Sequence, residues 1–190
     1  PLIFEPFDAI SGGNFHGEPV GLVMDYLSIA LSELGAISER RIFRMTDGKL
    51  NMGLPPMLVD SFESAGLNSG LMMPQYTAVS LVLENQTLST PDSVHSLPTS
   101  AEQEDHNANA MTAARHTIMI IHNIKRILAI ELFSAARAVD LRKKNHQGTL
   151  GKNTSVLFTK IREKIPYIAG DTYWNPQIDQ LYLQIENHEL

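Results

Sequence analysis

Two long stretches with apolar residues at three- and four-residue spacing constrain the fold of this chain more than any other feature. They cover residues 18–46 and 105–141, and Pro19 suits the first turn of the earlier one. The recurring apolar positions are Val20, Val23, Met24, Leu27, Ala30, Leu31 and Leu34, then Met111, Ala114, Ile118, Ile121, Ile124, Leu128 and Leu132. Helices of this length usually pack side by side in an extended bundle. No stretch alternates like a strand over a useful length, so we predict an all-α fold.

Glycine, proline and polar clusters separate further helices. We predict a helix at 69–88 with Ser69 as its cap, and two shorter helices at about 152–165 and 175–187. The architecture expected is therefore an extended bundle of long helices with shorter helices at the C-terminal end.

A polar break after residue 142 suggests two segments. We assign 1–145 to a long-helix bundle segment with active-site loops, and 146–190 to a short-helix C-terminal tail. The sequence opens on apolar residues without a methionine, which we interpret as a piece cut from a longer chain.

Composition excludes several classes of function. The net charge of −6 disfavours contact with phosphate backbones, so we expect no nucleic-acid partner. Cysteine is absent, which excludes disulfides and thiolate metal sites. The apolar run 117–133 is interrupted by polar and charged residues, and no signal peptide is visible, so we expect no membrane span and a cytoplasmic protein. No HxxxH or HExxH pair occurs, and no metal site is predicted.

The first candidate site is the loop Ser11-Gly12-Gly13-Asn14-Phe15-His16-Gly17. Glycines let a backbone approach a ligand closely and offer it amide donors. The same composition also suits a tight turn that leads into a helix. The loop by itself leaves both interpretations open.

The second candidate site is the polar cluster at 99–107, which contains Glu102, Gln103, Glu104, Asp105 and His106. Carboxylates at the start of a helix are stabilised by its free amide groups and dipole, and Asp105 fits such a capping or first-turn position. A functional interpretation requires a carboxylate that faces a cavity and accepts a proton or binds a cationic ring.

Taken together and in order, these motifs resemble the C-terminal part of the aromatic amino acid ammonia-lyases, and the histidine branch most closely. The matching segments are Ser11-Gly12-Gly13-Asn14-Phe15-His16-Gly17-Glu18-Pro19-Val20, Ser38-Glu39-Arg40-Arg41, Gly53-Leu54-Pro55-Pro56, Leu67-Asn68-Ser69-Gly70, Pro98-Thr99-Ser100-Ala101, Gln103-Glu104-Asp105-His106, Leu128-Ala129-Ile130-Glu131-Leu132 and Val139-Asp140-Leu141-Arg142. The resemblance weakens after about residue 145.

The resemblance implies a lyase that removes ammonia from an aromatic L-amino acid and leaves a trans-α,β-unsaturated acid. This family uses an electrophilic methylidene-imidazolone group, which forms from an Ala-Ser-Gly segment. No Ala-Ser-Gly occurs in this sequence. The catalytic tyrosines and the arginine that binds the substrate carboxylate also belong to upstream segments in the family. We therefore expect this chain to be inactive alone, as a fragment or as one chain of a split enzyme.

The resemblance also assigns roles to individual residues. Glu104 matches the catalytic carboxylate that faces the substrate ring, and Phe15 matches the ring beside the electrophile. We assign Asn14, Gln103 and Glu102 to substrate binding. Glu104 favours L-histidine as the substrate and urocanate as the product. Glu102 departs from the asparagine usual in that branch, which leaves phenylalanine and tyrosine ammonia-lyases and aminomutases as alternatives.

Active sites in this family form where several subunits meet in a tetramer. The resemblance therefore implies a homotetramer, or a complementary chain that carries the electrophile. The alternative from another functional class is a non-catalytic helical scaffold that serves assembly.

Overall fold

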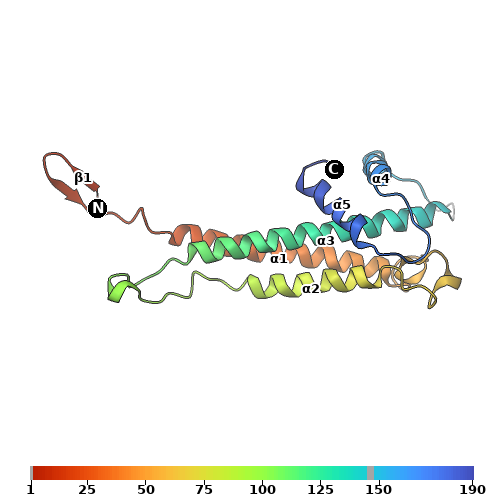
Figure 1. Cartoon of the computed structure of the whole chain (residues 1–190), viewed down its shortest axis with the longest axis horizontal. Helices are drawn as coiled ribbons and strands as arrows, with labels where there is room; N and C mark the ends of the chain where they lie inside the picture. Colours follow the sequence, from red (N-terminus) through yellow and green to blue (C-terminus); the bar gives the residue numbers. More distant parts are fainter. Residues whose placement is uncertain (1, 145–147) are drawn as a thin grey trace.

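The computed structural model describes residues 2–144 and 148–190. Three long helices lie along one another and form a rod, and two short helices contact the last of them (Figure 1). The long helices are α1 (Glu18–Thr46), α2 (Met72–Leu88) and α3 (Ala110–Lys144), and the short ones are α4 (Lys152–Lys164) and α5 (Asn175–Glu186). This arrangement confirms the predicted all-α fold. The expected boundary between residues 145 and 146 lies outside the described residues and stays a prediction.

The other elements are small. An antiparallel hairpin at the N-terminal end pairs β1 (Leu2–Phe4) with β2 (Asp8–Ile10). Three single-turn 3₁₀ helices lie in the connections, namely η1 (Pro56–Leu58), η2 (Phe62–Ser64) and η3 (Ser100–Glu102). The hairpin was not predicted, because strands of three residues are too short to establish an alternating pattern.

Two helices begin later than predicted. Leu71 occupies the N-cap position of α2, so the prediction of Ser69 as its cap was wrong. The Ser69 amide instead donates to the Asp171 carboxylate at 2.6 Å. Asp105 likewise precedes α3, whose first residue is Ala110. Asn109 adopts a φ of 50° there, in the left-handed region that interrupts a right-handed helix.

The hydrophobic core lies where α1, α2, α3 and α5 meet the connection that follows α1. Trp174 and Phe133 pack there with ring centroids 5.6 Å apart, and the Trp174 indole N–H donates to the Gly70 carbonyl at 3.0 Å. The fully buried apolar side chains include Ile42, Leu58, Leu71, Ile120, Ile127, Ile130, Leu141, Ile165 and Leu181. The early connection is therefore anchored by tail residues that follow it by about a hundred positions.

A buried arginine extends the same anchoring. The Arg137 side chain is 3% exposed and donates to the carbonyls of Leu58 and Ile168 at 2.6 and 2.8 Å. Its third donor reaches Asp60 at 3.3 Å, and the Tyr167 hydroxyl also donates to Asp60. Each charged group in this network has several partners, which a buried ion pair requires.

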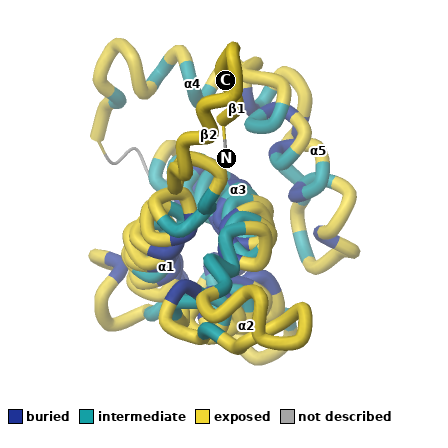
Figure 2. The backbone as a smooth tube through the Cα atoms, turned by 90° about the vertical axis from the view of Figure 1, so that its left-hand side faces the viewer, coloured by how far each residue is buried: buried dark blue, intermediate teal, exposed yellow. Residues whose placement is uncertain are grey.

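Helix α1 has an unusual distribution of polarity. Apart from Ile42, the residues that it buries are small or polar, whereas Val20, Val23 and Tyr26 are more than half exposed. The buried set is Gly21, Asp25, Ser28, Ser32, Gly35, Ser38, Glu39, Ile42 and Thr46. In Figure 2, most residues on the outer side of α1 are coloured as exposed. None of the residues that the structure describes covers the apolar face of α1.

The length and apolar composition of α1 also meet the criteria for a membrane-spanning helix. The core helices of soluble proteins meet the same criteria, so the observation is weak evidence for a membrane. Residues 117–133, on which the prediction of no membrane span rests, lie in α3 and not in this helix.

Candidate functional site: two loops at one end of the bundle

The two loops that the sequence singled out meet at one end of the rod. The first precedes α1 and the second precedes α3 (Figure 1). The rings of His16 and His106 stack with centroids 5.7 Å apart and planes 19° apart. Nε2 of His16 also lies 3.0 Å from the backbone oxygen of His106. Segments that are 90 residues apart in the sequence thus form one surface.

A buried carboxylate holds the base of the second loop. Asp25 on α1 accepts the backbone N–H groups of Asp92 and Ser93 at 3.1 and 2.9 Å. Burial acts to raise the pKa of Asp25, but the Ser93 and Asp92 hydrogen bonds and the charge of His116 outweigh it, so the pKa lies below its usual value. Oδ2 of Asp92 lies 2.8 Å from Nδ1 of His116, and the two groups form an ion pair when His116 is protonated. The geometry of this contact is not that of a hydrogen bond.

The tip of the second loop is a tight turn. Thr99 and Glu104 exchange backbone hydrogen bonds of 2.8 and 3.2 Å. Between them Ser100, Ala101 and Glu102 have φ values of 53°, 56° and 69°, in the left-handed region that non-glycine residues rarely adopt. Strained backbone of this kind is often found at functional sites, where surrounding structure compensates its cost.

The side chains assigned by resemblance lie on the outside of this surface. Phe15 is 78% exposed, and Asn14, Glu102, Gln103 and Glu104 are exposed too. The structure therefore brings the two loops together but does not enclose these side chains in a pocket. Their catalytic and binding roles stay predictions.

Sequence reasoning did not recognise the contact between His16 and His106. Among the described residues, no group of three or more histidine, aspartate or glutamate side chains is placed to hold a metal ion. Two histidines in separate glycine-rich or acidic loops carry no local signal that they stack.

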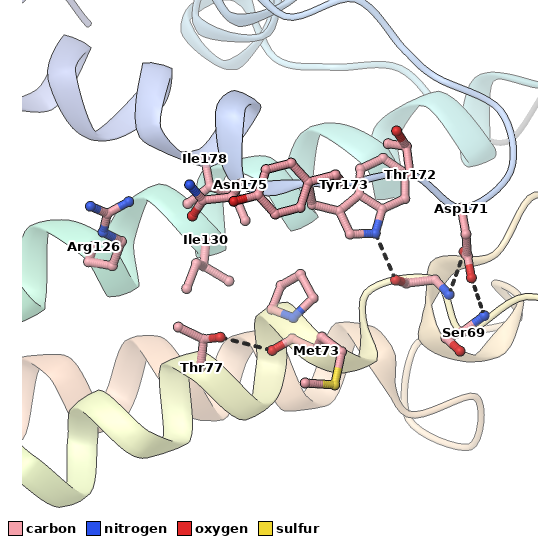
Figure 3. Close-up of a pocket in the computed structure, with 13 residues that line it drawn as sticks. Ser69, Met73, Thr77, Arg126, Ile130, Asp171, Thr172, Tyr173, Asn175 and Ile178 are labelled. Carbon is pink, nitrogen blue, oxygen red and sulfur yellow. Dashed lines mark hydrogen bonds between the residues drawn. The ribbon is translucent and has the colours of Figure 1, made fainter.

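A separate groove of about 420 Å³ lies between α2, α3 and the segment that leads into α5 (Figure 3). Its charged groups already have partners, since the Asp171 carboxylate accepts the amides of Ser69 and Gly70, and Arg126 pairs with Asp179. It lies away from the two loops, toward the core. We interpret this groove as part of the packing between the tail and the bundle.

Comparison with known proteins shows which family this chain resembles. Residues 1–163 match the family model described as aromatic amino acid lyase. The histidine ammonia-lyase of Chloroflexus aurantiacus is 45% identical over 184 residues, or 94% of this chain and 35% of that protein. The histidine ammonia-lyase of Caldanaerobacter subterraneus is 51% identical over 172 residues, or 90% of this chain and 32% of that protein.

Solved structures give the same picture. Histidine ammonia-lyase from Trypanosoma cruzi superposes with a TM-score of 0.89 at 37% identity, covering all of this chain and 36% of that one. Tyrosine aminomutase from Streptomyces globisporus also reaches 0.89, at 33% identity over all of this chain and 35% of that one. This chain thus spans about a third of the length of the relatives it matches. It belongs to the aromatic amino acid lyase family.

Proposed function

We propose that this chain is the C-terminal portion of a histidine ammonia-lyase, which eliminates ammonia from L-histidine and gives urocanate. The observation that carries the proposal is the contact between the Phe15 loop and the Glu104 loop, which places both assigned side chains at one end of the bundle. The names of the relatives at 45% and 51% identity support the choice of substrate.

In this proposal Glu104 acts on the substrate ring. Its carboxylate accepts a hydrogen bond from an imidazole N–H or takes part in proton transfer, since the side chain is exposed and free to meet a ligand. Phe15 packs against the reacting part of the substrate, and Asn14, Glu102 and Gln103 line the approach. The open position of these side chains suits a site whose other walls come from another segment.

A methylidene-imidazolone, when bound, would supply the electrophilic pull that makes removal of the weakly acidic β-proton feasible. The exposed Phe15 ring is an unreactive neighbour for such an electrophile. The chain has no cysteine, so it has no thiol that would react with the group. Phe15 would lie beside the group, and none of the residues of this chain would form it. We therefore expect this chain to be inactive without the segment that carries Ala-Ser-Gly.

Assembly is part of the same proposal. The exposed apolar residues of α1 need a cover in water, and a homotetramer or a complementary chain would provide it. Sedimentation analysis of the protein that contains this chain tests the tetramer directly. A protein that is monomeric and fully active would contradict the proposed tetramer.

The function itself is tested by incubating the assembled protein, with its Ala-Ser-Gly segment present, with L-histidine, L-phenylalanine and L-tyrosine. We expect urocanate from L-histidine and no comparable product from the other two. Formation of a β-amino acid would instead favour an aminomutase, a possibility raised by the tyrosine aminomutase neighbour. Turnover of none of the three substrates would leave the scaffold alternative.

Glu104→Gln is the sharpest single change, because it keeps the shape of the side chain and removes its charge. We expect kcat to fall by about 10²-fold or more, as for loss of a general acid–base group. The thermal midpoint should stay unchanged, since the side chain is exposed. Glu63→Gln, also exposed and in a connection, is the matched control and should keep full activity. Unchanged turnover in Glu104→Gln would remove this residue from the mechanism.

A further inference from the structure

We propose that His16, protonated only on Nε2, is a positioning residue that sets the distance between the Phe15 loop and the Glu104 loop. The inference rests on the proposed function for its effect on turnover. Its structural part concerns the contact itself and is tested independently below.

The hydrogen bonds of His16 define which ring nitrogen carries the proton. The backbone N–H of Glu18 donates to Nδ1 at 3.2 Å, so Nδ1 must present its lone pair. Nε2 lies 3.0 Å from the carbonyl oxygen of His106, which can only accept. Nε2 therefore carries the proton, because a neutral imidazole has one donor and one acceptor nitrogen. This tautomer satisfies both contacts, whereas the other tautomer and the doubly protonated ring each break at least one.

The other hydrogen bonds of the second loop do not replace this link. Asn107 bonds to Ser96 and Leu97, at 2.8 and 2.7 Å, and Asn109 bonds to Asp92 at 3.2 Å. These three contacts join parts of the second loop to one another, and the hydrogen bonds to Asp25 tie only the base of the loop to α1. They make the loop cohesive without fixing where it lies relative to Phe15.

Close packing beneath the loops brings their outer parts within reach of the His16 contact. A Cβ at Gly17 would lie 3.2 Å from the Cβ of Ala110, and a Cβ at Gly21 would lie 2.9 Å from the Ala108 carbonyl oxygen. The start of α1 and the residues before α3 are thus in direct contact. His16 is one residue from Phe15, and the carbonyl that it binds is two residues from Glu104, so the bond transmits the position of one loop to the other.

The carboxylate of Glu18 faces the second ring of the stack. Its Oε2 lies 3.6 Å from Nε2 of His106. This contact orients the His106 ring over His16 without occupying either nitrogen of His16. The His106 ring therefore lies between the His16 ring and the carboxylate on the first turn of α1.

Three substitutions at position 16 distinguish the effect of the hydrogen bond to the His106 carbonyl from the effect of simply having a side chain there. His16→Gln places an amide N–H near the position of Nε2 and can keep the bond to the His106 carbonyl. His16→Asn places its polar atoms near Nδ1, where they can meet the Glu18 amide but cannot reach His106. His16→Ala removes both contacts. His95→Asn, an exposed change in the same loop as Glu104, is the control.

In the assembled protein we expect His16→Asn and His16→Ala to lower kcat by about 10²-fold, the usual effect of misplacing a reacting group by about 1 Å. His16→Gln and His95→Asn should retain a kcat close to that of the wild type. In His16→Asn and His16→Ala, KM should change less than kcat. Equal kcat values in His16→Gln and His16→Asn, whether both high or both low, would overturn the proposal.

Hydrogen–deuterium exchange gives a readout that does not depend on activity. We expect faster exchange over residues 99–109 in His16→Asn and His16→Ala than in His16→Gln, with unchanged exchange along α3. Equal exchange in the three variants would overturn the positioning role even if the protein proves to be a lyase. If no aromatic amino acid is turned over, the proposed function fails while this measurement still decides the role of His16. If none of the variants folds, a crystal structure of the wild type decides, and a separation above 3.5 Å between Nε2 of His16 and the His106 oxygen would contradict it.

Discussion

The two ends of the helical rod differ in how completely this chain surrounds its own side chains. At the core end, Phe133, Trp174 and Arg137 are less than 9% exposed, and their polar atoms have partners within the chain. At the site end, Phe15 and Glu104 are open to solvent although their backbones are held in place. At the first end, this chain by itself buries these three side chains. In the proposed function, the remaining surroundings of the second end come from another segment or chain.

Two phenylalanines provide the strongest test of this difference. Phe133→Ala should destabilise the protein by about 3–5 kcal/mol, because a buried ring is lost and a cavity remains. Phe15→Ala should change the free energy of unfolding by less than about 0.5 kcal/mol, as for an exposed position. Denaturant unfolding of this chain on its own measures both, because in the proposed assembly other segments would cover Phe15. If Phe15→Ala costs as much as Phe133→Ala, another chain covers the site end as tightly as the core end is packed.

A smaller effect is expected where a single buried hydrogen bond is removed. Trp174→Phe keeps an aromatic ring against Phe133 but loses the N–H that bonds the Gly70 carbonyl. We expect a loss of about 1 kcal/mol in the free energy of unfolding. Tyr173→Phe, next along the chain and 74% exposed, is the control and should be neutral. Equal effects of the two changes would mean that the Gly70 carbonyl finds another donor.

A further effect appears only at alkaline pH. Burial and the hydrogen bond to Asp60 raise the pKa of Tyr167 to about 12. Since an unfolded tyrosine has a pKa of about 10, this contribution to stability is complete below pH 10 and is lost as the pH rises toward 12. An ultraviolet titration of the wild type against Tyr167→Phe should show one tyrosine that ionises late. A difference curve centred near pH 10 would show that the Asp60 contact does not persist in solution.

The sequence predicted the long helices well because their length gives a periodic pattern many turns in which to appear. The starts of α2 and α3 could not be located that way. They depend on Asp171, which takes the Ser69 amide, and on the left-handed conformation of Asn109. Both are tertiary or backbone effects that leave no mark on hydrophobic spacing.

Periodicity also identified the apolar face of α1 correctly but could not tell in which direction that face points. Such a pattern is normally interpreted as a core-facing stripe. Here Ser28 instead faces α3, where its hydroxyl lies 2.8 Å from that of Thr117, and apolar residues such as Val23 face outward. A spacing rule describes one helix, whereas the side that becomes buried depends on every chain in the assembly.

The candidate site was predictable in its parts and not in its assembly. The residues of both loops carry recognisable motifs, so Phe15 and Glu104 were named from sequence alone. The stack of His16 on His106 joins positions that are 90 residues apart, and nothing in either motif specifies the other.

The glycine at position 21 bears on how the specificity of such a site changes over time. Any side chain there would press on the Ala108 carbonyl, which is backbone and cannot rotate away. Mutations that alter substrate choice are usually sought among residues that touch the substrate. In this protein a single methyl group added on the first helix would lift the acidic loop from below and reshape the site without contacting any ligand.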